Sequence, residues 1–391
     1  MLTVIIKIKY LLILSKFYFN FVFPMKFTVF KNFKIFTLNL FITGLILIII
    51  DLFLSKYFGY FPALNIPETF VEFEETFDTK EIEKSKKSTK SKYSRDKNGY
   101  RPFKSIDETN ELIFTIGGST TDQKYVDDEK TWQRIMEKSA NISVINGGVE
   151  GQSSYGHLLA IKNWHAKVLP LEKVNKIIFY LGINDTRFSK SLETAKGNIY
   201  DSPNTFLRLK SYISRRSFLY SKLRKARFKF DVLRGTKLVS PDGITIAGHG
   251  TRNPIFLKNS IKSNIPLSNK DEIREYKELF SNLLKVSKST FTNAEIYIVQ
   301  QQDPKCRIER NSVFVNVTEK DIKNYCSSLA SIFFAQEEVI KNLNKLSKLN
   351  ISIIKMYKDN PISKEGFYDG IHTNIKGSSM IAEYLLKKII Y

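Results

Sequence analysis

A histidine and an aspartate close together in the sequence are the first sign of chemistry in this chain. Of its 391 residues four are histidines, and only His372 has an aspartate, Asp369, three residues earlier in a glycine-containing loop. This spacing lets the carboxylate hold one ring nitrogen while the other acts as a base. His157 and His165 show no such partner, and we expect structural or surface positions for them on a helix.

Ser119 is the predicted nucleophile that such a base would activate. It follows Gly117 and Gly118 directly after an apolar run, so the chain can turn sharply and present the hydroxyl. A Gly-Gly-Ser turn also fits a simple helix cap. The oxyanion formed by attack needs preorganised donors. The candidates are the backbone N–H groups of Ser119 and Gly151 and the side-chain amide of Asn184, although the last two also suit plain turns.

Strands and helices alternate in the part of the chain that must position these residues. Beyond residue 100, short apolar runs alternate with amphipathic stretches, which predicts a parallel sheet covered by helices on both faces. The predicted strands are 112–116, 142–145, 177–181, 296–299 and 351–354, and the predicted helices are about 132–139, 155–168, 270–288, 319–346 and 374–390. The fold class is therefore α/β, a flavodoxin-like three-layer sandwich with a five-stranded parallel sheet, preceded by an N-terminal transmembrane helix.

Four segments rich in glycine and polar residues lie where predicted strands end. GGSTT (117–121), NGGVEGQSS (146–154) and GIND (182–185) follow the first three strands, and DGIH (369–372) follows the fifth, just before the last helix. In open parallel sheets, ligands bind outside the carboxyl ends of the strands. The four segments are therefore expected to meet on one rim of the sheet.

Taken together and in this order, the four segments resemble the SGNH (GDSL-like) hydrolase family. The four residues for which the family is named fall on Ser119, Gly151, Asn184 and His372. Its Asn-x-Gly-x-x-Gly, Gly-x-Asn-Asp and Asp-x-x-His patterns match 146–151, 182–185 and 369–372. The resemblance covers about residue 100 onward. It implies a triad of Ser119, Asp369 and His372, an oxyanion hole of Ser119, Gly151 and Asn184, and no metal or organic cofactor.

The chain departs from the family pattern in two places. Gly118 replaces the acidic residue of the usual Gly-Asp-Ser, and the GGSTT form looks similar to a membrane-anchored branch of the class, so we do not interpret it as a loss of activity. Residues 186–269 form a long insertion with many basic residues. Because it is a run of charged residues, the default interpretation of this insertion is a solvent-exposed helical segment. The alternatives are that it shapes the substrate site or that it lies along the membrane surface.

Composition argues against a disordered protein and against a nucleic-acid partner. Hydrophobic residues make up 42% of the chain and aromatic residues 13%, which is ample for a packed core. The formal net charge is +22, but the lysines are scattered, without a helix-turn-helix pattern, zinc-finger spacing or an aromatic-rich RNA-binding strand. We expect a solvated lysine-rich surface, or attraction to an anionic lipid or acidic glycan layer.

The two cysteines leave two interpretations open. Cys306 and Cys326 lack the spacing of a zinc site, which needs four ligands in short pairs. They either pair as a disulfide in an oxidising compartment or stay as two free buried thiols.

The N-terminal part predicts a membrane anchor. Residues 35–54 are apolar apart from Asp51, and at about 1.5 Å per residue they just span a layer of about 30 Å. No small-residue cleavage site follows, which favours an uncleaved anchor over a signal peptide. Lysines precede the segment and glutamates follow it, so the positive-inside rule places the large C-terminal part outside the cytoplasm.

The predicted organisation has four parts. These are a cytoplasmic basic and apolar segment (1–34), the transmembrane helix (35–54), a flexible tether that is rich in Ser and Lys (55–99), and the hydrolase domain with its insertion at about 186–269 (100–391). Residues 2–23 are a poor second span, an interfacial helix, or an upstream extension of a protein that starts at Met25. If they do span, the orientation argument has to be redone.

The sequence as a whole predicts a single-pass membrane protein with an esterase domain on the extracytoplasmic side. Ser119 attacks the ester, His372 relays the proton, and Asp369 orients His372. The expected substrate is an acylated polysaccharide or lipid of the cell envelope. The alternatives are an O-acyltransferase with the same triad and an inactive binding protein of the envelope. A nucleic-acid-binding protein, suggested by charge alone, is the weakest alternative.

Overall fold

The three-dimensional structure is a computed structural model of the chain. It describes residues 33–58, 72–79, 82–83, 87, 89–105, 111–187, 217, 219, 223, 260–264, 270–309, 312–316, 320–347 and 349–391. The chain divides into two units, Met1–Phe53 and Leu54–Tyr391, which are described separately. The interpretations of residues 2–23 lie outside the described residues, as does most of the insertion predicted at 186–269.

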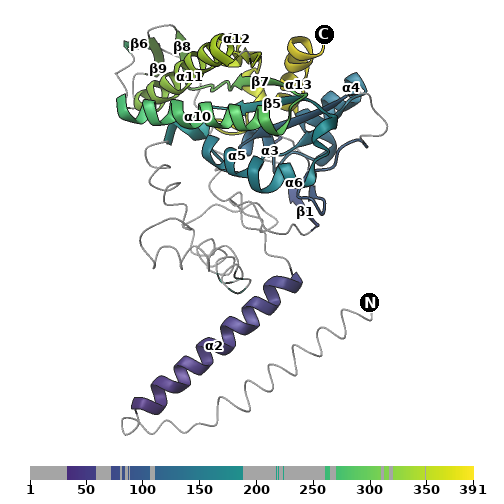
Figure 1. Cartoon of the computed structure of the whole chain (residues 1–391), viewed down its shortest axis with the longest axis vertical. Helices are drawn as coiled ribbons and strands as arrows, with labels where there is room; N and C mark the ends of the chain where they lie inside the picture. Colours follow the sequence, from purple (N-terminus) through teal and green to yellow (C-terminus); the bar gives the residue numbers. More distant parts are fainter. Residues whose placement is uncertain are drawn as a thin grey trace. The chain divides into compact units, whose positions relative to one another are not determined.

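Helix α2, Phe33–Phe58, forms where the membrane span is predicted (Figure 1). Among the residues that the structure describes, none of the helices combines the length and the apolarity that crossing a membrane requires. The helical conformation of 35–54 is therefore confirmed, whereas its placement across a membrane is not.

A five-stranded parallel sheet forms the centre of the second unit, in the spatial order β10-β7-β5-β3-β4. Read from β4 and counted along the chain, this is 2-1-3-4-5, the flavodoxin-like order. The order reverses between β3 and β5, so the carboxyl ends of these two strands flank the expected ligand crevice. All five predicted strands are confirmed, as β3 Leu112–Gly117, β4 Ser143–Asn146, β5 Val174–Leu181, β7 Glu295–Gln300 and β10 Ile351–Ile354.

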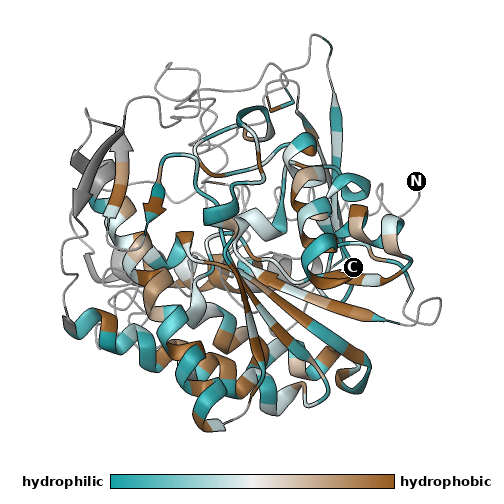
Figure 2. Cartoon of the chain, turned by 90° about the horizontal axis from the view of Figure 1, so that it is seen from above, coloured by the Kyte–Doolittle hydropathy of each residue, from teal (hydrophilic) through white to brown (hydrophobic). Residues whose placement is uncertain are grey.

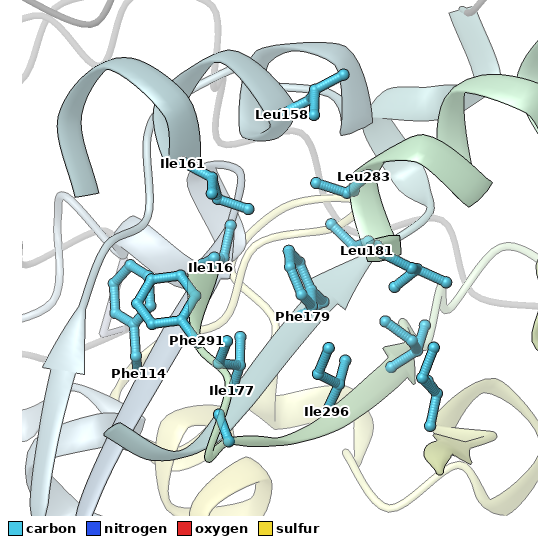
Figure 3. Close-up of a cluster of buried hydrophobic side chains, with 14 of the residues drawn as sticks. Phe114, Ile116, Leu158, Ile161, Ile177, Phe179, Leu181, Leu283, Phe291 and Ile296 are labelled. Carbon is cyan, nitrogen blue, oxygen red and sulfur yellow. The ribbon is translucent and has the colours of Figure 1, made fainter. Parts of the chain in front are cut away.

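Helices cover both faces of this sheet and complete the three layers. Side chains alternate along β3, so that Phe114 and Ile116 enter one core cluster and Ile113 enters another. The first cluster, part of which Figure 3 shows, lies under α5, α10 and α11; the second lies under α4 and α13. The helices are α4 Trp132–Ala140, α5 Ser154–Ala160, α6 Ala166–Val168, α10 Lys270–Thr290, α11 Lys320–Ser347, α12 Met356–Asp359 and α13 Ile375–Ile389, with a π-helical turn at Ile161–His165 between α5 and α6.

The predicted alternation of strands and helices follows from where apolar residues fall. In Figure 2 the strands of the sheet are largely hydrophobic along their length, whereas the helices alternate between hydrophobic and hydrophilic residues. Every residue of β3 is buried, as expected for a strand with helices on both faces. The five predicted helices are confirmed to within a few residues at their ends.

An N-terminal hairpin packs onto this domain, so that residues 73–78 and 90–95 depart from the prediction of a flexible tether at 55–99. Strands β1, Phe73–Asp78, and β2, Lys90–Arg95, pair antiparallel. Along β2 the side chains of Ser91, Tyr93 and Arg95 are buried and those of Lys90 and Lys92 are not. Inward-facing polar groups are tolerated because they are hydrogen-bonded, which an apolar pattern does not reveal. The folded domain thus begins before residue 100.

A second small sheet, which the sequence did not predict, lies beside α11. It consists of β6 Ser260–Asn264, β9 Ser312–Asn316 and β8 Arg307–Glu309, all antiparallel. A disulfide joins Cys306, just before β8, to Cys326 of α11. Of the two interpretations of the cysteines, the structure therefore supports the disulfide.

Candidate active site

Ser119, His372 and Asp369 form one hydrogen-bonded series at the carboxyl edge of the sheet. Ser119 is the first residue of the short helix α3, Ser119–Asp122, directly after β3. His372 Nε2 lies 2.8 Å from Ser119 Oγ, and His372 Nδ1 lies 2.6 Å from Asp369 Oδ2. The hydroxyl and the carboxylate thus occupy opposite ring nitrogens, as a nucleophile, its base and the orienting acid must.

The loop before α13 fixes the orientation of the His372 ring. The second carboxylate oxygen, Asp369 Oδ1, accepts hydrogen bonds from the N–H groups of Ile371 (2.8 Å) and His372 (2.6 Å). The ring of Tyr368 stacks on the imidazole at 5.7 Å between centroids and 15° between planes. Both oxygens of Asp369 are therefore engaged, and the histidine is held from its backbone and from one face of its ring.

Asn184 lies next to the nucleophile segment. It belongs to the 3-10 turn Ile183–Arg187, and a Cβ at Gly118 would overlap its Nδ2, so a larger residue before Ser119 would displace the Asn184 side chain. Asn184 Nδ2 donates to the carbonyl of Gln152 at 2.9 Å. Gly151, the residue before Gln152, lies in an exposed turn with φ +72°. The proposed oxyanion donors thus come from adjoining loops, and their role stays a prediction.

Asp185, which the sequence analysis noted only as part of a motif, ties two of these loops together. Its buried carboxylate accepts hydrogen bonds from the N–H (2.8 Å) and Oγ (2.8 Å) of Ser154 and from the hydroxyl of Tyr276 (3.2 Å). Burial raises the pKa of Asp185, and the hydrogen bonds from Ser154 and Tyr276 oppose this shift. The start of α5 is thereby held against the segment that carries Asn184.

Gln123, which sequence reasoning missed, connects the serine side of the site to the histidine side. It adopts φ 51°, and its side-chain amide donates to Thr373 Oγ1 at 3.0 Å and Ser378 Oγ at 2.6 Å. Its side-chain oxygen accepts from the N–H of Trp132 at 2.9 Å. The only indication of this role in the sequence is that Gln123 lies four residues after Ser119.

Gln301 was missed as well. It follows β7, and its amide donates to Thr120 Oγ1 at 2.5 Å while its side-chain oxygen accepts from the N–H of Ile183 at 3.1 Å. It links the nucleophile helix to the Asn184 turn. No motif covers it, although it follows a predicted strand at the same rim as the other segments.

The remaining described histidines lie apart from this series. His165 Nδ1 lies 2.9 Å from the hydroxyl of Tyr100, and His157 Nδ1 lies 2.8 Å from Gln152 Oε1, and both rings are fully buried. Within the described ranges, no group of three or more His, Cys, Asp and Glu is placed to hold a metal ion. Both histidines therefore have the structural position expected of them.

His157 should make the fold sensitive to acid. Burial lowers the pKa of His157 to about 3, against about 6.5 in the unfolded chain. Between these values the unfolded state binds more protons, so the free energy of unfolding falls as the pH drops from about 6.5 towards 3. In denaturant titrations at several pH values, His157→Gln should make the free energy of unfolding depend less on pH. Part of the dependence should remain, because burial also lowers the pKa of His165. Equal slopes for variant and wild type would contradict the prediction.

A serine, histidine and aspartate in series at the carboxyl edge of a parallel sheet are the arrangement of an α/β serine hydrolase. Residues 113–385 match the sequence profile of the GDSL-like lipase/acylhydrolase family. The chain belongs to this family and is therefore a hydrolase of ester bonds. None of the curated proteins matches it.

Several solved structures are similar to this chain at low identity. A protein described as a GDSL-like lipase from Bacteroides ovatus is 12% identical, with a TM-score of 0.39, and the match covers 72% of this chain and 53% of the other. This chain therefore spans about half the length of that protein. Phospholipase A1 from Streptomyces albidoflavus is 10% identical over 72% and 99%, with a TM-score of 0.34. A family 3 carbohydrate esterase from Clostridium thermocellum is 11% identical over 71% and 94%, with a TM-score of 0.33.

Proposed function

We propose that the chain hydrolyses an ester through an acyl-enzyme on Ser119. The observation that carries this proposal is the series in which Ser119 Oγ lies 2.8 Å from His372 Nε2 while the other ring nitrogen lies 2.6 Å from Asp369. A serine hydroxyl bonded in this way loses its proton to the imidazole as it attacks, and the carboxylate stabilises the imidazolium that forms.

The reaction then proceeds in two halves. Ser119 Oγ bonds to the carbonyl carbon, its proton passes to His372 Nε2, and the oxyanion accepts from the N–H groups of Ser119 and Gly151 and from Asn184 Nδ2. The intermediate collapses when His372 gives the proton to the departing alcohol. A water then attacks the acyl ester, giving its proton to His372, and the acid leaves as the proton returns to Ser119 Oγ.

The proposed substrate is an acylated glycan or lipid of the cell envelope. A formal net charge of +22 favours association with acidic glycans or anionic lipids. The disulfide between Cys306 and Cys326 supports an oxidising location outside the cytoplasm. Exposed apolar side chains on α2, such as Leu40, Phe41 and Ile48, support contact with a membrane, as the resemblance to a membrane-anchored branch implies.

Covalent labelling tests the proposal. The full-length chain is treated with a fluorophosphonate, which reacts with activated serines, and compared with Ser119→Ala and with Ser289→Ala, which removes an exposed hydroxyl on α10. Label should appear in wild type and in Ser289→Ala and be absent from Ser119→Ala. A folded wild-type protein that takes up no label would overturn the proposal and favour an inactive binding protein.

The same acyl-enzyme would serve an O-acyltransferase, in which a sugar hydroxyl replaces water. The measurement is the fate of the acyl group from an acetyl ester in the presence of an added glycan. Free acetate identifies a hydrolase, and acetylated glycan identifies a transferase.

A further inference from the structure

The side chain of Arg95, at the end of the N-terminal hairpin, reaches into the active-site rim. It is 3% exposed. Its Nη2 lies 2.7 Å from Asp122 Oδ1 and 2.7 Å from the carbonyl oxygen of Gly148. Asp122 is the last residue of the helix that Ser119 begins, and Gly148 lies three residues before Gly151. One guanidinium nitrogen thus bonds both the nucleophile helix and the loop that carries an oxyanion donor.

The rest of the guanidinium is held by the hairpin and by the turn that follows it. Arg95 Nε donates to the hydroxyl of Tyr93 at 2.9 Å, and Nη1 donates to the carbonyl of Gly99 at 2.6 Å. The hydroxyl of Tyr93 also lies 3.2 Å from Asp122 Oδ1. Because the guanidinium is planar and its donors have fixed directions, these bonds set the position of Nη2.

The two segments that Arg95 bonds also touch each other directly. A Cβ at Gly148 would overlap the backbone N of Asp122, so the loop rests on the helix with no side chain between them. A further bond runs from Asn146 Nδ2 to the carbonyl of Thr121 at 2.8 Å. Besides this direct contact, the Asn146 amide and the charged Arg95 side chain supply hydrogen bonds between the two segments.

We propose that Arg95 is a positioning residue for hydrolysis at Ser119. Through Asp122 and Gly148 it sets the distance between the serine hydroxyl and the Gly151 N–H. This inference rests on the proposed function. Oxyanion donors must lie at about 2.7–3.1 Å from the developing charge, and a displacement of about 1 Å at such a site costs on the order of 10²-fold in rate. The loss should therefore appear in kcat rather than in KM.

Two variants separate positioning from simple pairing of charges. Arg95→Lys keeps a positive charge for Asp122 but lacks the planar fork. The double variant Arg95→Met/Asp122→Asn removes both charges, so that no unpaired carboxylate stays buried. If Arg95→Lys does not fold, the double variant alone tests the inference. On p-nitrophenyl acetate, both should lose at least about tenfold in kcat with KM within about threefold. A double variant with the kcat of wild type would overturn the inference.

The control variant is Glu137→Gln, on α4. The buried Glu137 carboxylate accepts from the N–H of Val144 at 2.8 Å and of Lys104 at 2.9 Å, away from the carboxyl edge of the sheet. This variant should lose stability and keep its kcat, which shows that a loss of stability alone does not lower kcat.

Hydrogen exchange tests the same inference without relying on activity. In both Arg95 variants, backbone amides in peptides covering 117–123 and 146–152 should exchange faster than in wild type, whereas peptides from α13 should not. Unchanged exchange in both segments of the double variant would overturn the inference about Arg95. A wild-type protein without activity or label would instead overturn the proposed function, so the two failures are distinguishable.

Discussion

Replacing His372 with alanine should lower kcat for ester hydrolysis by about four to six orders of magnitude. The variant leaves Ser119 without the base that lies 2.8 Å from its hydroxyl. It also removes the group that protonates the departing alcohol, so both halves of the reaction slow. KM should change little because the imidazole acts mainly in the transition state. The measurement is steady-state hydrolysis of p-nitrophenyl acetate, with the purified variant checked for folding by circular dichroism.

The control for this prediction is a second buried histidine. His165→Phe keeps an aromatic ring beside Tyr100 and Phe114, where His165 packs, and removes only the bond to the hydroxyl of Tyr100. It should retain kcat within about threefold and lose about 1 kcal/mol of stability. Ser119→Ala/His372→Ala should be no slower than either single variant, because the two residues act as one unit. If His372→Ala kept more than a tenth of the wild-type kcat, this assignment of the base would be wrong.

Replacing Phe179 with alanine should cost about 3–5 kcal/mol of unfolding free energy. Phe179 is completely buried on β5, the central strand of the sheet, among the side chains shown in Figure 3. Helices close both faces of this strand, so the surroundings cannot collapse fully into the space that the ring leaves. Denaturant unfolding followed by circular dichroism measures the effect as a lower midpoint at unchanged slope.

The matched control is Leu346→Ala. The side chain of Leu346, on α11, is 80% exposed, so its loss should change stability by less than about 0.5 kcal/mol. A loss below about 1 kcal/mol for Phe179→Ala would show that β5 is not packed as described.

The sheet could be predicted from the sequence because its strands are buried on both faces. Runs such as 112–116 and 177–181 are almost wholly apolar. When glycine-rich turns follow such short apolar runs, few structures other than a buried parallel strand fit the pattern. The loop segments could then be placed on one rim, because strands of a parallel sheet all end at the same edge. This is why Ser119 and His372, far apart in sequence, could be assigned to one site.

The hairpin could not be predicted, because its inward-facing residues are polar. In β2 the buried positions are Ser91, Tyr93 and Arg95, and a Ser- and Lys-rich stretch of this kind is typical of an unfolded tether. The hairpin is stabilised by hydrogen-bond and ion-pair partners in the rest of the domain, above all by Asp122. Such pairing is visible only in three dimensions.

The supporting glutamines escaped prediction for a related reason. Gln123 and Gln301 act through single side-chain amides that bridge segments far apart in sequence. An amide has no characteristic partner, so no spacing in the sequence indicates such a bridge. Motifs indicated the candidate catalytic residues, whereas the contacts that hold them in place required the structure.

The distance along the chain between Ser119 and His372 bears on when activity can begin. The two residues are 253 positions apart, and all five sheet strands precede the histidine together with every proposed oxyanion donor. Synthesis proceeds from the N-terminus, and early parts of a domain are made before later ones. A nascent chain that has reached β7 thus possesses the serine without its base. Ester cleavage at Ser119 is withheld until β10 has joined the sheet and the segment after it has placed His372, so an incompletely made polypeptide stays inert towards the esters that it meets.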